Sequence, residues 1–299
     1  MLKKQSQKKK IGPLYTLMFI VLSLYAILMF VLVLWAIVTS LKFQSDFRTN
    51  VLGLPSGHIW TWAWSNFPLV FENFSVTVLA GGTMSIIGFW QMLLYTILYA
   101  GVGALISGIV PCFVAYVTVK CDFRFNNILY GIVIVTLALP IVGAAPSEIQ
   151  VLRQLGLYNT IWGTWVQKFH FLGMYYLVFC AAFKSISNEY MEAAYMDGAG
   201  DWQVLLRIML PLVRNTLFTV ILIRFIDYWN DYQTPLLYIP SYPTLAVGVY
   251  NLGYTTVGVM SYVPMRMAAC IILLVPIFVL FLLFRNRLMG NLSMGGIKE

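Results

Sequence analysis

Long stretches of this chain carry no charged side chain, and that feature limits its fold more than any other. No Asp, Glu, Lys or Arg occurs between Lys10 and Lys42, and the residues from Asn73 to Val119 are uncharged as well. A helix needs roughly 20 mostly apolar residues to cross the hydrocarbon core of a bilayer. Only 10% of the 299 residues are charged, whereas soluble domains are about a quarter charged. The sequence therefore predicts a membrane protein with several spans.

The distribution of charge argues against several other classes of protein. The net charge of +8 does not indicate a nucleic-acid partner, because the basic residues flank apolar runs and form no face of their own. Five of the nineteen basic residues lie in the first ten positions, which is typical of a cytoplasmic anchor before a first span. The apolar run behind them is too long for a signal peptide. No GxxxxGK[ST] pattern or metal-ligand spacing occurs, so we expect no bound cofactor, no metal site and no ATP hydrolysis by this chain.

Six membrane spans are expected, at about 13–41, 86–118, 127–147, 161–183, 216–237 and 263–284. The segment 42–85 should lie outside, since Gly81 and Gly82 interrupt its uncharged part. With both chain ends in the cytoplasm, thirteen Lys and Arg residues fall on the cytoplasmic side and five on the outer side, and Arg224 lies within a span. This excess favours cytoplasmic termini. A seventh span at 73–85 would be short and would weaken the charge bias.

The segment from Glu192 to Leu212 is unusually polar for its place between two spans, and the topology puts it in the cytoplasm. Residues 189–196 are good helix formers with acidic residues at the start, which suits the helix dipole. Gly198 can adopt a positive φ and end this helix. Asp201 can cap a second helix.

In the second helix an apolar stripe is expected at positions i, i+3, i+4 and i+7. Its members are Trp202, Leu205, Leu206 and Met209. Pro211 should mark the turn into the fifth span. A helix–glycine–helix segment of this kind is either a loop on the membrane surface or a docking surface for a partner.

The same segment carries the pattern Glu-Ala-Ala, three residues, Gly, nine residues, Ile, one residue, Leu-Pro. The matching residues are Glu192, Ala193, Ala194, Gly198, Ile208, Leu210 and Pro211. This pattern resembles the EAA loop of the permease subunits of ABC importers. The resemblance implies that residues of about 186–214 form a coupling loop that fits a cleft in a cytoplasmic ATPase subunit.

Further motifs resemble those of carbohydrate permeases of the maltose type. Asp197 and Ala199 complete their EAA-x-x-DGA form, and FIDYWNDYQTPL at 225–236 is similar to their fifth-span motif. The segments TSLK, LGLYNT and GGIKE also fit this group. Ser187 and Asn215 stand where a proline is common in the family, and the segment 42–85 matches poorly.

The resemblance implies an all-α membrane protein of the type I ABC importer permease fold, with six transmembrane helices and a cytoplasmic EAA coupling loop. Its expected division is a cytoplasmic N-terminus at 1–12, a permease domain at 13–287 and a cytoplasmic tail at 288–299. The implied partners are a second related permease, two ATPase subunits that use ATP and Mg²⁺, and an external sugar-binding protein. The implied location is the bacterial plasma membrane.

Two other functions stay open at this point. A permease for another solute, such as a polyamine or phosphate, would also carry an EAA loop. A secondary transporter is the alternative from a different class, although the sequence has no inverted repeat and no helix clearly broken at mid-membrane.

Ionisable residues inside spans are costly and tend to line cavities or to pair with one another. The candidate substrate path on the fifth span consists of Asp227, Trp229, Asn230 and Asp231. The competing interpretation is a structural ion pair between Arg224 and Asp227, with the aromatic residues packed against the second permease.

Two smaller expectations concern the other spans. Lys168 in the fourth span should extend its side chain toward the membrane surface. The glycines of the second span, Gly101, Gly103 and Gly108, should be positions of close helix packing.

Overall fold

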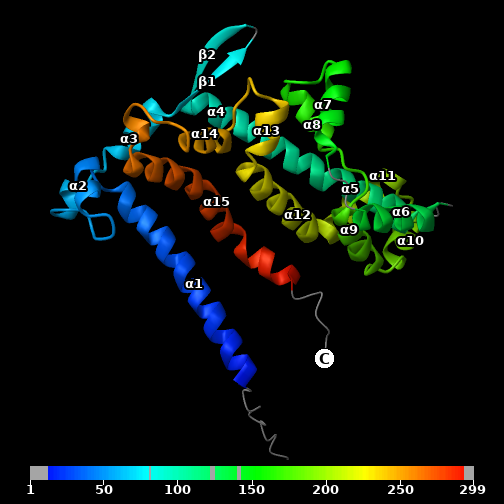
Figure 1. Ribbon diagram of the computed structural model, residues 1–299. Helices are drawn as coiled ribbons and strands as arrows, with labels where there is room; N and C mark the ends of the chain where they lie inside the picture. The colour runs from blue at the N-terminus through cyan, green and yellow to red at the C-terminus, as the bar shows by residue number, and fades with distance from the viewer. Residues whose placement is uncertain (1–12, 81, 122–124, 140–142, 293–299) are drawn as a thin grey trace, which may run out of the picture. The chain divides into compact units, whose positions relative to one another are not determined.

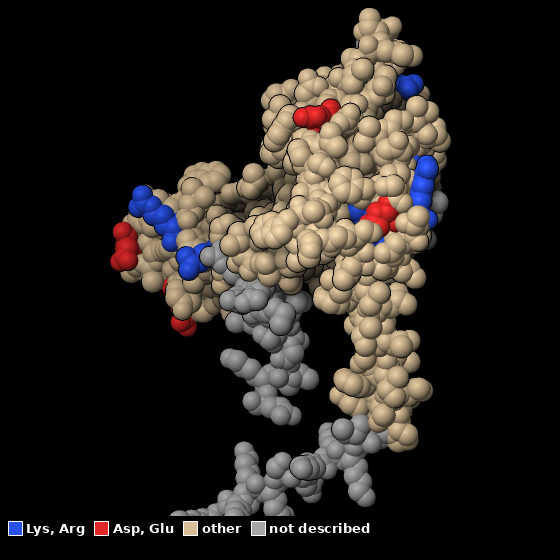
Figure 2. Space-filling model, turned by 90° about the vertical axis from the view of Figure 1, so that its left-hand side faces the viewer, with Lys and Arg blue, Asp and Glu red and all other residues tan. Residues whose placement is uncertain are grey.

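The computed structural model describes residues 13–80, 82–121, 125–139 and 143–292. These residues form two compact units. One unit contains the residues up to Val70 together with Thr256–Ile272, and the other contains Phe71–Thr255 and the residues from Leu273 onward. Most of the described surface visible in Figure 2 belongs to uncharged residues, as expected for a protein that lies in a membrane.

The first unit begins with one long helix, α1 (Pro13–Ser40). Most apolar side chains of α1 between Leu14 and Leu34 are exposed, so this helix offers its sides to lipid or to another chain. The short helix α2 (Gln44–Thr49) follows, then a 3₁₀ turn at Ile59–Thr61 and the start of α3 (Asn66–Asn73). The Asn66 side chain donates to the backbone oxygens of Ser40 and Lys42, at 2.8 and 2.9 Å, and so ties α3 to the C-terminal end of α1.

The second unit contains a hairpin and most of the remaining helices (Figure 1). The hairpin strands are β1 (Ser75–Ala80) and β2 (Thr83–Gly88), which pair antiparallel. The helices are α4 (Phe89–Thr96), α5 (Gly103–Lys120), α6 (Asn126–Ala138), α7 (Ala145–Gln154), α8 (Ile161–Gln167), α9 (Met174–Lys184), α10 (Glu189–Met196), α11 (Asp201–Val204), α12 (Leu210–Asn230), α13 (Gln233–Tyr238) and α14 (Leu245–Leu252). π-Helical turns at Ile97–Val102 and Leu205–Met209 join α4 to α5 and α11 to α12. The last helix, α15 (Val263–Leu292), and a 3₁₀ turn at Val259–Ser261 complete the described chain.

The membrane-length helices agree with the expected spans at three places. Residues 13–40, 89–120 and 263–284 are helical, long and apolar enough to cross a bilayer. The segment 42–85 contains no such helix among its described residues, as expected. The hairpin of β1 and β2 was not expected. It forms because Gly82, at φ +84°, allows a tight turn between two runs rich in β-branched residues.

The third and fourth expected spans differ from the structure. The third, expected at 127–147, is the 13-residue helix α6, which ends at Ala138. The fourth, expected at 161–183, is divided into α8 and α9 by the non-helical residues 168–173. Both regions still contain a short apolar helix, at Ile128–Ala138 and Met174–Lys184. The helix expected at 161–183 is therefore interrupted, and six spans remains a prediction.

The fifth span also begins much earlier than expected. The helix runs from Asp201 to Asn230, through the second π-helical turn and α12. Pro211 does not mark a turn, because the helix continues through it directly after the π-helical turn at Leu205–Met209. The second helix of the polar loop and the fifth span are therefore one continuous helix.

The core of the second unit lies where α5, α9 and α12 pack together. Gly108 is the point of closest approach, since a Cβ atom there would lie 2.5 Å from Cγ1 of Ile221. A Cβ at Gly103 would lie 3.3 Å from the ring of Tyr228, whereas Gly101 has open space. Close packing is therefore confirmed at Gly103 and Gly108 and is wrong at Gly101.

We expect Gly108→Ala to destabilise the chain relative to Gly131→Ala, which adds the same methyl group to α6 with nothing within 4 Å. Overpacking of this kind costs about 1–3 kcal/mol, while both variants gain the same helix propensity. Thermal unfolding of the two purified variants in detergent measures the difference. Equal melting temperatures would contradict a close helix contact at Gly108.

Candidate functional site

The polar loop is a helix–turn–helix in which the turn depends on Gly198. Helix α10 spans residues 189–196, as the sequence predicts. Gly198 has φ +80°, and its N–H donates to the Tyr195 oxygen at 3.0 Å. The N–H of Ala199 donates to the Ala194 oxygen, also at 3.0 Å. This pair of hydrogen bonds is a Schellman motif, which satisfies the last carbonyl groups of α10 and requires the left-handed conformation that glycine favours.

The start of the second helix differs from the expectation that Asp201 caps it. Gly200 is the N-cap, and its N–H donates to Oε1 of Gln203 at 3.2 Å. Asp201 is the first helical residue, and its carboxylate accepts from the hydroxyl of Tyr195 at 2.9 Å. Asp201 therefore joins the two helices across the turn.

Only two of the four residues expected in the apolar stripe of the second helix are buried. Leu205 and Met209 are buried, but Trp202 and Leu206 are exposed. Val204 is fully buried in their place. The π-helical turn at 205–209 has a wider period than an α-helix, so a spacing of 3.6 residues does not describe which side chains share a face.

The motif residues of the loop divide into two groups. Those that face outward are Glu192, Ala193, Asp197 and Gly198, with Pro211 at the start of α12. Those that pack against the core of the second unit are Ala194, Ala199, Ile208 and Leu210. Near the outward group lie the exposed apolar side chains of Met196, Trp202 and Leu206. One group therefore holds the loop against the membrane helices, and the other is accessible to another protein.

Lys120, at the end of α5, fixes the entry to this loop. Its ammonium group donates to the Ile186 backbone oxygen and to Oδ1 of Asn188, both at 2.6 Å. These acceptors directly precede α10. The sequence alone does not reveal this role of Lys120, because its acceptors lie 66 and 68 residues away along the chain.

The four candidate path residues do not share one face of the fifth span. Trp229 is buried, and its Nε1 donates to the Leu273 oxygen at 3.3 Å. Asp227 and Asn230 are exposed. Asp231 lies just beyond α12, where its Oδ1 accepts from the N–H of Thr234 at 3.0 Å. The fifth span therefore presents Asp227 and Asn230 outward and uses Trp229 and Asp231 for internal contacts.

Asp231 belongs to a buried polar cluster that the sequence does not reveal. The Tyr99 hydroxyl donates to Oδ2 of Asp231 at 2.6 Å, and the Lys168 ammonium donates to the same hydroxyl at 3.1 Å. Lys168 is only 7% exposed, and its ammonium lies 4.0 Å from the ring centre of Tyr228. The Tyr228 hydroxyl is 2.7 Å from Oγ of Ser107. Lys168 does not reach toward the membrane surface, because its partners lie inside the second unit.

The predicted ion pair of Arg224 and Asp227 is present but partly exposed. The closest N–O distance is 3.7 Å, and the Asp227 side chain is 51% exposed. The guanidinium of Arg224 also stacks on the ring of Tyr175, 4.4 Å from its centre. An ionisable side chain that is exposed within a span cannot face lipid without a large cost, so Asp227 faces water or another chain.

This arrangement matches one family of transport proteins. Residues 109–292 match the family described as the binding-protein-dependent transport system inner membrane component. The chain belongs to this family. It is thus a multi-pass inner-membrane component of an ABC-type transport system, and such a component works with a partner permease, an ATPase and a substrate-binding protein.

Individual relatives cover most of the chain. It is 22% identical over 277 residues to the diacetylchitobiose uptake system permease protein NgcG of Streptomyces coelicolor, covering 92% of this chain and 86% of NgcG. It is 27% identical over 262 residues to the sn-glycerol-3-phosphate transport system permease protein UgpE of Yersinia pestis, covering 87% and 89%. A chain in the crystal structure of a bacterial ABC transporter involved in the import of the acidic polysaccharide alginate has the same fold, with a TM-score of 0.71, 21% identity and coverage of 91% and 95%.

Membership of this permease family decides against a secondary transporter. The predicted carboxylate roles also change. In this permease Asp231 stabilises a buried cation, whereas Asp227 is exposed.

We expect Asp231→Asn to lower the yield of folded permease and Asp227→Asn to leave it near the wild-type yield. The first variant leaves Lys168 buried without a carboxylate in its cluster, at a cost of about 3–5 kcal/mol. Size-exclusion chromatography and thermal unfolding of both variants in detergent measure the effect. Equal yield and stability for the two variants would rule out a structural role for the buried cluster.

Proposed function

We propose that this chain is a permease subunit of a bacterial ABC importer that moves a carbohydrate across the plasma membrane. The proposal is carried by the coupling-type loop, in which a Gly198-dependent turn exposes one group of motif residues and anchors the other. The sugar class is supported by the Asp197–Ala199 form of the loop and by relatives whose names include diacetylchitobiose and arabinooligosaccharides.

The loop provides a mechanical connection between ATP hydrolysis and the membrane helices. ATP and Mg²⁺ act in separate ATPase subunits, and this chain binds no cofactor and has no ATP site of its own. The exposed side chains of Glu192, Met196 and Trp202 contact a cleft of the ATPase. When the ATPase subunits close, the loop moves, and the permease changes between inward-open and outward-open states as a rigid-body rearrangement.

Asp227 and Asn230 are the residues of the fifth span that contact the transported sugar or the second permease. Their exposed polar groups can hydrogen-bond to sugar hydroxyl groups. Trp229 and Asp231 support this face from inside the second unit. Of the four residues predicted to line the substrate path, only Asp227 and Asn230 can therefore contact the solute directly.

The function and the coupling role are tested together by threonine substitution of two glycines in the loop. Gly198 and Gly200 both have open space around their Cα atoms, but only Gly198 has a positive φ. Because a β-branched residue at positive φ costs on the order of 1–3 kcal/mol, Gly198→Thr should lose ATPase binding and uptake. Gly200→Thr should retain both, since threonine and glycine are similar as N-caps.

The measurement is ATP-dependent uptake into proteoliposomes that contain the complete transporter with its binding protein. The solutes are radiolabelled N,N′-diacetylchitobiose, an arabino-oligosaccharide and sn-glycerol 3-phosphate. The proposal is supported if the wild type takes up either sugar and Gly198→Thr does not. Uptake of only sn-glycerol 3-phosphate would overturn the sugar class, and equal uptake by both variants would overturn the coupling role.

The loop can meet a cytoplasmic ATPase only if the chain ends also lie in the cytoplasm, and the excess of basic residues supports this orientation. A reporter that is active only in the cytoplasm should therefore be active after Lys298 and inactive when inserted at Gly57. The opposite activity at either position would contradict the proposed orientation.

A further inference from the structure

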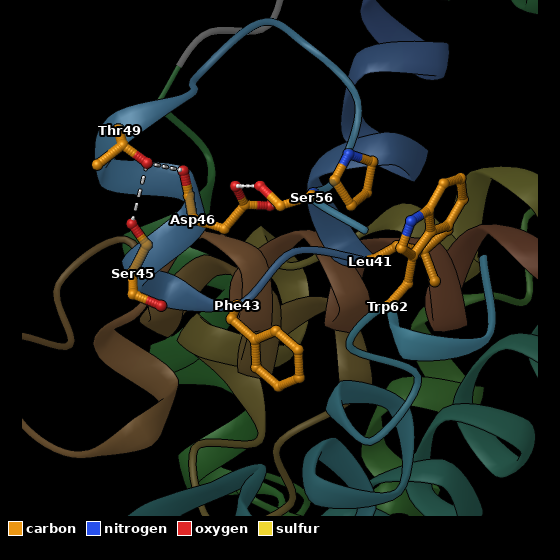
Figure 3. Close-up of a pocket in the computed structure, with 8 residues that line it drawn as sticks. Leu41, Phe43, Ser45, Asp46, Thr49, Ser56 and Trp62 are labelled. Atoms are coloured by element: carbon orange, nitrogen blue, oxygen red, sulfur yellow. Dashed lines mark hydrogen bonds between the residues drawn. The ribbon is translucent and has the colours of Figure 1, made fainter. Parts of the chain in front are cut away.

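A surface cavity of about 440 Å³ lies in the segment that follows α1, for which the family resemblance implies no role. Its wall combines apolar and polar side chains (Figure 3). The lining residues are Leu41, Phe43, Ser45, Asp46, Thr49, Pro55, Ser56 and Trp62. The volume is within the range of roughly 300–1,000 Å³ that is usual for small-molecule sites.

The loop that forms one side of this cavity is held in place by side chains from three positions. Nε1 of Trp35 donates to the Val51 oxygen at 3.0 Å. The ammonium group of Lys42, which is only 1% exposed, donates to the Asn50 oxygen at 2.7 Å and to the Val51 oxygen at 3.3 Å. Asp46 accepts from both the N–H and the hydroxyl of Ser56. Because an unpaired buried cation is costly, these hydrogen bonds to Lys42 hold the loop in a defined shape.

The polar groups in the wall suit a ligand with hydroxyl groups. The hydrogen bonds from Ser56 lower the pKa of Asp46, so its carboxylate is ionised at neutral pH and acts only as an acceptor. Each carboxylate oxygen has a further lone pair that can accept from a ligand. The wall therefore offers a charged hydrogen-bond acceptor to a ligand.

The apolar groups in the wall suit the flat face of a sugar ring. Phe43, Pro55 and Trp62 are among the residues that line the cavity. Aromatic faces pack against C–H groups, while the edge of the same sugar ring carries the hydroxyls. The only charged lining residue is Asp46, which disfavours a phosphate or carboxylate ligand. A lipid chain is also disfavoured, because four of the eight lining residues are polar and one of them carries a charge.

We propose that this cavity is a binding subsite for one uncharged pyranose unit of the transported carbohydrate, outside the hydrocarbon core. The inference rests on the proposed function, which supplies the sugar and places this segment on the outer side. The subsite holds a sugar unit next to the outer end of α1 before the substrate enters the membrane part of the permease.

The experiment measures equilibrium binding of radiolabelled N,N′-diacetylchitobiose to the complete transporter in nanodiscs, without the binding protein. Phe43→Ala and Trp62→Leu each remove a ring from the cavity wall. Trp60→Ala is the matched control, because Trp60 lies on the same segment, is 91% exposed and does not line the cavity. Loss of one aromatic contact should weaken this site about tenfold, and Trp60→Ala should bind like the wild type.

The outcomes separate the subsite from the transport function. Selective loss of one binding site per complex in Phe43→Ala and Trp62→Leu supports the subsite. Equal binding by all four proteins, equal loss in Trp60→Ala or no saturable binding by the wild type would overturn it. If sugar uptake depends on Gly198 but the binding experiment gives one of the contradicting results, the subsite proposal is wrong and the proposed transport function still holds. If no sugar is taken up at all, the proposed function itself fails.

Discussion

The structure depends on the requirement that polar groups inside an apolar protein find partners within the chain. An unsatisfied polar group in lipid costs several kcal/mol, and the break in the fourth span would create several of them. The Lys168 backbone oxygen accepts from the hydroxyl of Ser107 at 3.3 Å and from the N–H of His170 at 2.8 Å. The Lys168 ammonium reaches Asp231 through the hydroxyl of Tyr99. A non-helical segment can exist here because α5, the π-helical turn before it and the residue after α12 supply partners for Lys168.

The features that could be predicted from the sequence are those set by neighbouring residues. The bounds of α10 and the turn at Gly198 depend on hydrogen bonds between residues no more than five apart, and both were predicted. The first, second and sixth spans follow from the length of their uncharged runs. In each of these cases the residues of one short stretch of sequence are sufficient to predict the local structure.

The features that were missed depend on contacts between distant residues or on a change of helical period. Lys168 was predicted to extend toward the membrane surface. The prediction failed because the hydrogen-bond partner that holds Lys168 inside the protein, Tyr99, is 69 residues away in the sequence. The stripe from Trp202 to Met209 was predicted with 3.6 residues per turn, but the π-helical turn rotates the later side chains to a different face. The start of the fifth span was missed because Pro211 was taken as a break, although the helix continues through this proline next to the π-helical turn at Leu205–Met209. Tertiary packing decides each of these points.

The continuous helix from Asp201 to Asn230 connects the two parts of the candidate site. Its first turn contains the carboxylate that joins the loop helices across Gly198, and the residue after its last turn is Asp231, which holds the Lys168 cluster. A well-packed helix moves as a unit rather than by compression. A displacement of the loop must therefore either move the end of α12 or bend the helix at the π-helical turn, the segment whose hydrogen-bond pattern is already irregular. In the first case the bond between Tyr99 and Asp231 changes with each cycle of the ATPase. Under the proposed coupling, the buried cluster is then the place where movement of the loop reaches the interior of the second unit.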